Sequence, residues 1–213
     1  PALNLEPFYP GWGATSGNVI NPGLNNTTMA QMNMYGSVLS GGLAGHAWGD
    51  VWYAGAAHAF HPTRSVNMNN PQVNALGEFT SNTGQTLNFE SQAMGHLKSF
   101  ILDSGHEYER LIPAADTNLS NSQNFVQTLS ISDDKAFALG FLTTSYNVPN
   151  LTNLLASETY RFEWWDVTNG VWTNEGNLTT SAGGQLVPPN RPDNTKNWAY
   201  RIRTLDYING MPT

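Results

Sequence analysis

The stretch ETYRFEWWDV at residues 158–167 decides how the second half of the chain is interpreted. It is short and rich in aromatic residues, and a polar segment with glycine follows it, as is typical of a strand that ends in a turn. Six runs of this kind, separated by Asp, Asn, Gly and Pro, predict an antiparallel β-sandwich of about a hundred residues. The runs are NFVQTLSI, KAFALGFLTT, ETYRFEWWDV, GVWTNEGNLTT, GQLVPP and NWAYRIRTL.

The sandwich is expected to occupy residues 114–213, with a boundary near residues 110–118, and to be self-contained. Trp164 and Trp165 are most simply interpreted as core or near-core residues, and a surface platform for sugars is the alternative. The expected core is made of apolar residues from these runs, namely Phe125, Leu129, Phe137, Leu139, Phe141, Phe162, Trp164, Trp172 and Trp198.

Residues 1–113 follow a different pattern. Apolar residues recur at steps of three and four in TMAQMNMYGSVLSGG and in NFESQAMGHLKSFILDSG, which predicts helices over residues 28–40 and 88–103. The runs ALNL at 2–5 and LAGHAWG at 43–49 are short enough to be buried strands. The order strand, helix, strand, loop, helix predicts the last part of an α/β repeat.

The composition limits the partners of this 213-residue chain. Hydrophobic residues at 39%, with 11% aromatics, are sufficient for packed cores, and charged residues at 12% are about half the usual share. A net charge of −7 with nine Lys and Arg provides no basic patch for a phosphate backbone, so nucleic acid is not expected as a partner. The sequence holds no apolar stretch of about eighteen residues, so no membrane span is expected.

The weakly charged, Asn-rich and Thr-rich surface favours a secreted, periplasmic or cell-surface location. The chain has no Cys, so it can form neither disulfides nor thiolate metal sites. No leader is present at Pro1, and a leader of an exported protein would have been removed or would lie upstream. Asn-x-Ser/Thr motifs, which also arise by chance in a chain rich in Asn, begin at Asn25, Asn26, Asn118, Asn150 and Asn177.

Only two strands are visible in the α/β part, and a parallel sheet needs several strands with both faces covered. An isolated strand at residues 2–5 would leave a row of backbone groups unpaired. The sequence therefore predicts that an upstream segment or a separate chain completes this region.

Four segments resemble, in this order, the second half of the apiosidase-like glycoside hydrolases. They are LNLEPFY at 3–9, YGSVLSGGLAGHAWG at 35–49, HLKSFI followed by YERLIP at 96–113, and WWDVTNGVW followed by RPDNTKNWAYRI at 164–202. The resemblance implies the C-terminal portion of a TIM-type (β/α) barrel followed by a small antiparallel β-sandwich, often labelled a collagen-binding domain. Residues 3–5 and 43–48 would then be barrel strands seven and eight, and active sites of such barrels lie at the C-terminal ends of the strands.

Glu6 is the family's nucleophile by this resemblance, and the family's acid/base would lie upstream of Pro1. Glycoside cleavage needs two carboxylates about 5 to 9.5 Å apart, so Glu6 supplies half of the mechanism. Sugar rings offer C–H faces that stack on indole and phenol rings. Near the ends of the two strands, the expected substrate-binding residues are Tyr9, Trp12, His46, Trp48, Asp50 and Trp52.

Each of these residues also has a purely structural interpretation. A Glu between an apolar run and a Pro is ordinarily a solvated residue at a strand end, Asp50 could cap a turn, and His46 could be a hydrogen-bonded interior histidine. His58 and His61 lie three residues apart, but no third ligand at usable spacing accompanies them, so no metal site is expected.

The sequence thus predicts a glycoside hydrolase that acts on plant or microbial oligo- or polysaccharides without a cofactor, by a retaining or an inverting route. Two alternatives on the same scaffold are a non-catalytic extracellular carbohydrate-binding protein and a structural assembly protein. A carboxylate partner within about 10 Å of Glu6 distinguishes the enzyme from both.

Overall fold

A computed structural model describes residues 3–4, 26–41, 45–46, 72–73, 79–80, 91–103, 105–120, 127–144 and 146–210. Its largest element is a six-stranded antiparallel sheet with the strand order β5-β6-β7-β10-β8-β9. The six strands are β5 (Leu111–Pro113), β6 (Gln127–Ser132), β7 (Phe137–Leu142), β8 (Thr159–Asp166), β9 (Val171–Thr179) and β10 (Trp198–Thr204).

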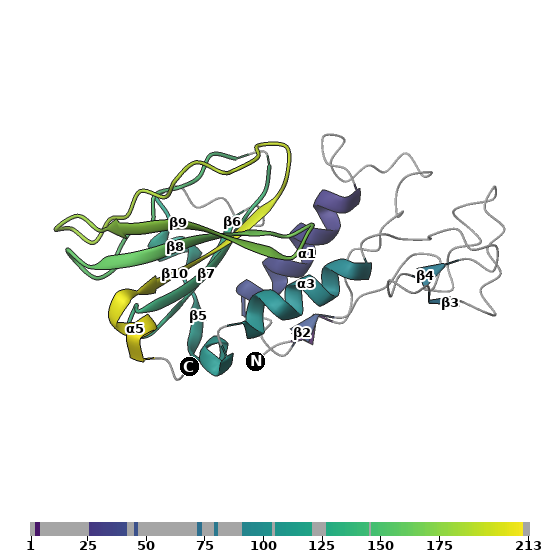
Figure 1. The fold of residues 1–213 in the computed structure, drawn as a ribbon, viewed down its shortest axis with the longest axis horizontal. Coiled ribbons are helices and arrows are strands. Elements are labelled where there is room, and N and C mark those ends of the chain that lie inside the picture. The colour runs from purple at the N-terminus through teal and green to yellow at the C-terminus, as the bar shows by residue number, and fades with distance from the viewer. Residues whose placement is uncertain are drawn as a thin grey trace.

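Both faces of this sheet are covered, because every residue of the central strands β6 and β7 is buried. On one face, which we call the helix-facing side, lie α1 (Asn26–Leu39) and α3 (Ser91–Leu102), next to each other (Figure 1). Their apolar residues share a core with the strands, for example Tyr35 and Phe100 with Phe141 and Trp165. The helices and the sheet are therefore joined by one hydrophobic core.

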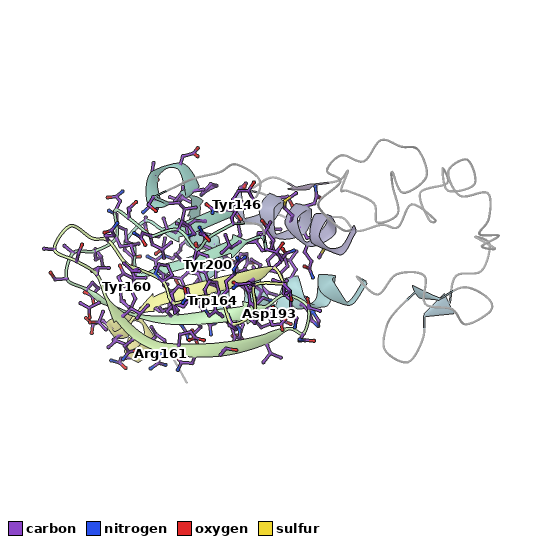
Figure 2. The ribbon with its side chains drawn as sticks, turned by 90° about the horizontal axis from the view of Figure 1, so that it is seen from above. Tyr146, Tyr160, Arg161, Trp164, Asp193 and Tyr200 are labelled. Carbon is purple, nitrogen blue, oxygen red and sulfur yellow. The ribbon has the colours of Figure 1, made fainter. Side chains whose placement is uncertain are left out.

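The opposite face, which we call the loop-facing side, is covered by irregular chain. Leu151 forms isolated bridges to Leu119 and Leu186, and these three residues pack on an aromatic cluster from β8 and β10. Trp164 and Tyr200 lie edge to face with their ring centroids 5.7 Å apart, near the middle of the sheet (Figure 2). The Tyr200 ring lies directly over Gly140, where a Cβ atom would clash with it, so only glycine fits at this position.

The two ends of the sheet differ from its centre. The edge strand β5 has three residues and ends at Pro113. The other edge strand, β9, contains a bulge: Phe162 pairs with Gly176 and Glu163 with Asn174, so Glu175 is an extra residue. A bulge of this kind bends the strand and increases its local twist.

Short elements flank the sheet. The 3-10 helix η1 (Gly105–Arg110) leads into β5, α4 (Ala115–Asn118) follows β5, and α5 (Leu205–Gly210) follows β10. Tyr207 of α5 stacks on Phe137 with ring centroids 5.8 Å apart, which closes the helix-facing side next to the start of β7.

The expected two-sheet sandwich is not confirmed. Among the described residues the strands of this region form one sheet, and the run GQLVPP contributes only the bridge at Leu186. The expected single core is also wrong, because its residues divide between the two faces. Phe137, Leu139 and Phe141 face the helices, whereas Leu129, Phe162, Trp164 and Trp198 face the loops, and Phe125 lies outside the described residues.

The N-terminal elements agree with the predicted order. β1 (Leu3–Asn4) and β2 (Gly45–His46) pair in parallel on either side of α1 in the sequence, and α3 falls within the second expected helix. The antiparallel pair β3 (Gln72–Val73) and β4 (Phe79–Thr80) lies in a span expected to be a loop. The adjacency of the two predicted barrel strands is thus confirmed, whereas a closed barrel and the division at residue 113 stay predictions.

Candidate functional site

The carboxyl ends of β1 and β2 form the edge at which the predicted active site lies. Leu3 pairs with Gly45 and Asn4 with His46, in parallel register. Parallel neighbours lie about 4.8 Å apart and end at the same edge of their sheet. In the sequence Glu6 follows Asn4 by two positions, and Trp48 follows His46 by two positions. The two segments expected to carry the chemistry therefore begin side by side.

His46 is the predicted site residue whose backbone the structure places, as the last residue of β2. The others lie outside the described residues, as do His58 and His61, and their assignment stays a prediction. They are Glu6, Tyr9, Trp12, Trp48, Asp50 and Trp52.

The helix α1, which lies between β1 and β2 in the sequence, is attached to the sheet by a buried side-chain hydrogen bond. The Trp165 Nε1–H group donates to the Tyr35 hydroxyl over 2.9 Å. Tyr35 also stacks on Phe141 of β7, with ring centroids 5.3 Å apart and 18° between the planes. Burial raises the pKa of Tyr35 above its ordinary value, so this hydroxyl remains protonated at neutral pH.

Polar contacts also hold both ends of α1. Near its start, the Asn197 Nδ2 group donates to Gln31 Oε1 over 2.9 Å, and Gln31 Nε2 donates to Thr168 Oγ1 over 3.4 Å. At its end, the Ser130 hydroxyl donates to the Leu39 carbonyl over 2.6 Å. The sheet therefore fixes the helix that lies, in the sequence, between the two segments predicted to carry active-site residues.

The Trp-x-Asp-x-x-x-Gly segment at residues 164–170 forms a turn that contacts α3. Asp166 Oδ1 accepts hydrogen bonds from the backbone N–H groups of Thr168 and Asn169. Gly170 adopts φ +67°, and a Cβ atom there would lie 2.6 Å from the His96 ring. Glycine at this position thus allows both the turn and the close approach of α3.

An ionic cluster lies on the helix-facing side, and the sequence analysis did not identify it. Arg201 donates from Nε and Nη2 to both oxygens of Glu163, over 2.7 and 3.1 Å, and Arg203 Nη2 donates to Glu163 Oε2 over 2.8 Å. Arg201 Nη1 also reaches Asp103, the residue after α3, over 3.0 Å. The signal in the sequence was the alternation of charged with aromatic or aliphatic residues in YRFEWW and AYRIR.

The sheet lacks features of a sugar-binding platform in the part of the chain that the structure describes. No aromatic side chain there is exposed, and Trp164 and Trp165 are buried in the two cores. The core interpretation of this Trp pair is therefore confirmed. The described residues also contain no cluster of three metal-ligating side chains and no helix long and apolar enough to cross a membrane.

Comparison with known proteins shows a likeness in structure. No family model matches the chain, and no curated protein does. A solved structure titled glycoside hydrolase family 5 from Bacteroides vulgatus ATCC 8482 superposes with a TM-score of 0.63 at 11% identity, over 97% of this chain and 42% of that one. Another, titled glycoside hydrolase, gives 0.59 at 10% identity, over 84% and 37%.

The chain thus spans about two fifths of the length of each of these two proteins. At such low identity the likeness concerns the fold: this chain has the fold of part of a glycoside hydrolase. Activity, substrate and partners do not follow from the fold alone.

Proposed function

We propose that the protein is a glycoside hydrolase of the apiosidase-like kind, which cleaves glycosidic bonds of plant or microbial polysaccharides. The observation that carries this proposal is the parallel β1–β2 pair, whose carboxyl ends lead into Glu6 and Trp48. The fold supports it, because two solved structures titled as glycoside hydrolases superpose on this chain with TM-scores of 0.59 and 0.63.

In this proposal Glu6 acts on the anomeric carbon of the sugar. In a retaining enzyme its carboxylate attacks that carbon, and a second carboxyl group about 5 to 5.5 Å away protonates the leaving oxygen. In an inverting enzyme Glu6 instead activates a water molecule, and the two groups lie about 6.5 to 9.5 Å apart. The second carboxyl group comes from an upstream segment or a separate chain that completes the barrel.

The neighbouring residues bind the sugar. Rings of Tyr9, Trp12, Trp48 and Trp52 stack on its C–H faces, and His46 and Asp50 hydrogen-bond its hydroxyl groups. Because polymeric substrates of this kind occur outside cells, the proposal includes a secreted, periplasmic or cell-surface location.

Substitution of Glu6 by Gln in the intact natural protein tests this function. We expect the turnover of an aryl glycoside to be abolished, because the amide is nearly isosteric but is neither a nucleophile nor a base. Glu175→Gln is the matched control, since Glu175 is exposed on the bulge of β9. Unchanged turnover in Glu6→Gln, with activity present in the parent protein, would exclude the role of Glu6.

A further inference from the structure

On the helix-facing side, residues that pair with each other on β7, β10, β8 and β9 form rows across the strands. Three successive rows change from apolar to charged along the strand direction. The first row, Phe141–Ala199–Trp165–Trp172, packs against the helices. The second row is Leu139–Arg201–Glu163–Asn174, and the third is Phe137–Arg203–Arg161–Asn177. The third row therefore places two arginines and an asparagine next to each other on three adjacent strands.

The second row is balanced in charge. Glu163 is 8% exposed and binds both Arg201 and Arg203, and Asp103 provides a second carboxylate for Arg201. The guanidinium of Arg201 also lies 4.0 Å from the centre of the Trp172 ring. Glu163 thus accepts three hydrogen bonds from Arg201 and Arg203, and within the described residues none of its contacts involves Arg161.

Arg161 is this third arginine, and it lies directly opposite Arg203. Its Nε atom is buried, and within the described residues Arg161 has no hydrogen-bond acceptor and no carboxylate partner. Side chains directly opposite on antiparallel strands have Cβ atoms about 4.5 to 5.5 Å apart, and like charges at that distance repel. Burial and then the charge of Arg201 lower the pKa of Arg203, and the charge of Arg161 lowers it further.

Three arginines on two adjacent strands are unusual for this chain, and with the carboxylates of Glu163 and Asp103 they leave one positive charge unbalanced among the described residues. Arg161, Arg201 and Arg203 are three of only nine Lys and Arg residues in a chain with net charge −7. Arg161 lies at the end of the sheet away from α1 (Figure 2), and its neighbour Asn177 is exposed. The third row is thus open to solvent at its β9 end, beside Asn177, whereas the Arg203 side chain is only 11% accessible and α5 packs on β8 and β10.

We propose that Arg161, Arg203 and Asn177 form a binding site for an oxyanion. A carboxylate or sulfate group suits the three side chains, since guanidinium groups donate paired hydrogen bonds to oxyanions and the Asn amide adds a further donor. The bound anion would be the negatively charged partner that Arg161 lacks within the described residues. Two sources offer this chemistry, an acidic sugar unit and a free inorganic anion.

An NMR titration of the intact, nitrogen-15-labelled protein tests the site. Sodium sulfate is added and compared with sodium chloride at equal ionic strength, while the Nε–Hε signals of the arginines are recorded. We expect the Arg161 signal and the Asn177 side-chain amide signals to shift saturably with sulfate only. In Arg161→Gln the Asn177 shift is lost, whereas in Arg161→Lys it is weakened and in Lys98→Gln, which removes an exposed charge on α3, it is unchanged.

Two saccharide probes then distinguish the sources. Tri-galacturonate is compared with its methyl ester, which has the same rings without the negative charge. Binding of the acid at lower concentration than sulfate, with none by the ester, assigns the site to an acidic sugar. Equal binding of sulfate and the acid assigns it to a free anion.

Several outcomes would overturn the site. These are the absence of a saturable shift in the parent protein, an equal shift with chloride, or an unchanged sulfate response in Arg161→Gln. If Arg161→Gln does not fold, the parent protein and Arg161→Lys still decide the question. The measurement reports binding, so it is independent of the activity of Glu6.

Discussion

The two faces of the six-stranded sheet are buried to a similar extent but by different means. The loop-facing side is dominated by rings such as Trp164 and Tyr200 under irregular chain, and its core side chains donate hydrogen bonds to backbone carbonyls, for example Trp198 Nε1 to Asp193. The helix-facing side combines an apolar core with polar contacts that specify partners, among them Trp165 with Tyr35 and Arg201 with Asp103. Both faces are close-packed, but a hydrogen bond between side chains also requires a defined donor–acceptor distance and angle.

The loop-facing side therefore contributes mainly to stability, whereas the side-chain hydrogen bonds of the helix-facing side also fix the position of α1. Hydrogen bonds hold α1 near both of its ends, and α1 lies between the strands that lead to the predicted active site. The sheet is therefore connected to the candidate site through one helix. Three substitutions test these contributions. They are given in order, from the largest to the smallest expected effect on the free energy of unfolding.

The largest effect is expected for Trp164→Ala on the loop-facing side. Trp164 is fully buried and contacts the rings of Phe162, Trp198 and Tyr200. Removal of a buried Trp leaves a large cavity and costs about 3–5 kcal/mol of the free energy of unfolding. Urea unfolding followed by circular dichroism measures this loss.

The matched control is Val187→Ala, because Val187 is 65% exposed. It is expected to change the free energy of unfolding by less than about 0.5 kcal/mol. A similar loss in both variants would show that the aromatic cluster does not dominate the stability of this face.

A smaller effect is expected for Tyr35→Phe on the helix-facing side. The substitution keeps the stacking on Phe141 but leaves the buried Trp165 Nε1–H group without its acceptor. An unsatisfied buried donor costs about 1–3 kcal/mol. Tyr146→Phe is the control, since Tyr146 is half-buried and no hydrogen bond of its hydroxyl occurs within the described residues. Equal unfolding midpoints for the two variants in urea would contradict the role of the Tyr35 hydroxyl.

The smallest effect is expected for Asp134→Asn, at the exposed turn between β6 and β7. Burial alone would raise the pKa of Asp134, but hydrogen bonds from Ser132, Arg110 and the Ala136 N–H lower it to about 2. The folded-state pKa is thus below the ordinary value of about 3.9, so the stabilisation is present above pH 4 and is lost as the pH falls from about 4 to about 2.

Because Asp134 and Arg110 are largely exposed, with 48% and 40% of their side chains accessible, solvent screening limits the effect to about 1 kcal/mol or less. The difference between the parent protein and Asp134→Asn should therefore be small at pH 7 and should disappear near pH 2. Thermal unfolding across this range, with Glu175→Gln as the control, checks the expected pH dependence. A difference that grows on acidification would reverse the sign and contradict the prediction.

Periodicity and turn residues were sufficient to locate most elements. The helical pattern predicted α1 and α3, and five of the six β runs became β6 to β10. The prediction of a strand at GQLVPP was wrong because Pro188 and Pro189 have no backbone N–H group to donate to a neighbouring strand. The prediction of a single core was wrong because β7 is buried on both faces, so the residues of FALGFL carry no pattern that distinguishes one face from the other.

The candidate site was less accessible to sequence reasoning. The sequence predicted that the strands at 3–5 and 43–48 are neighbours, which the structure confirms, and the register that pairs Asn4 with His46 comes from the structure. The ionic cluster and Arg161 were not anticipated, since charged residues within strands are ordinarily solvent-exposed. Only the register of β8 against β10 shows that Arg161 faces Arg203 rather than a carboxylate.

The edges of a sheet are the places at which a second copy of the chain could add a strand. An open edge of unpaired N–H and C=O groups is a template on which another chain can add a strand and start an aggregate. Here β5 offers three residues ending in Pro113, and β9 is bent by the bulge at Glu175, which also adds a negative charge. Neither edge gives a long, straight and apolar template. Growth of fibres or arrays by strand addition is thus disfavoured at both ends of the sheet, which speaks against an assembly role based on these edges.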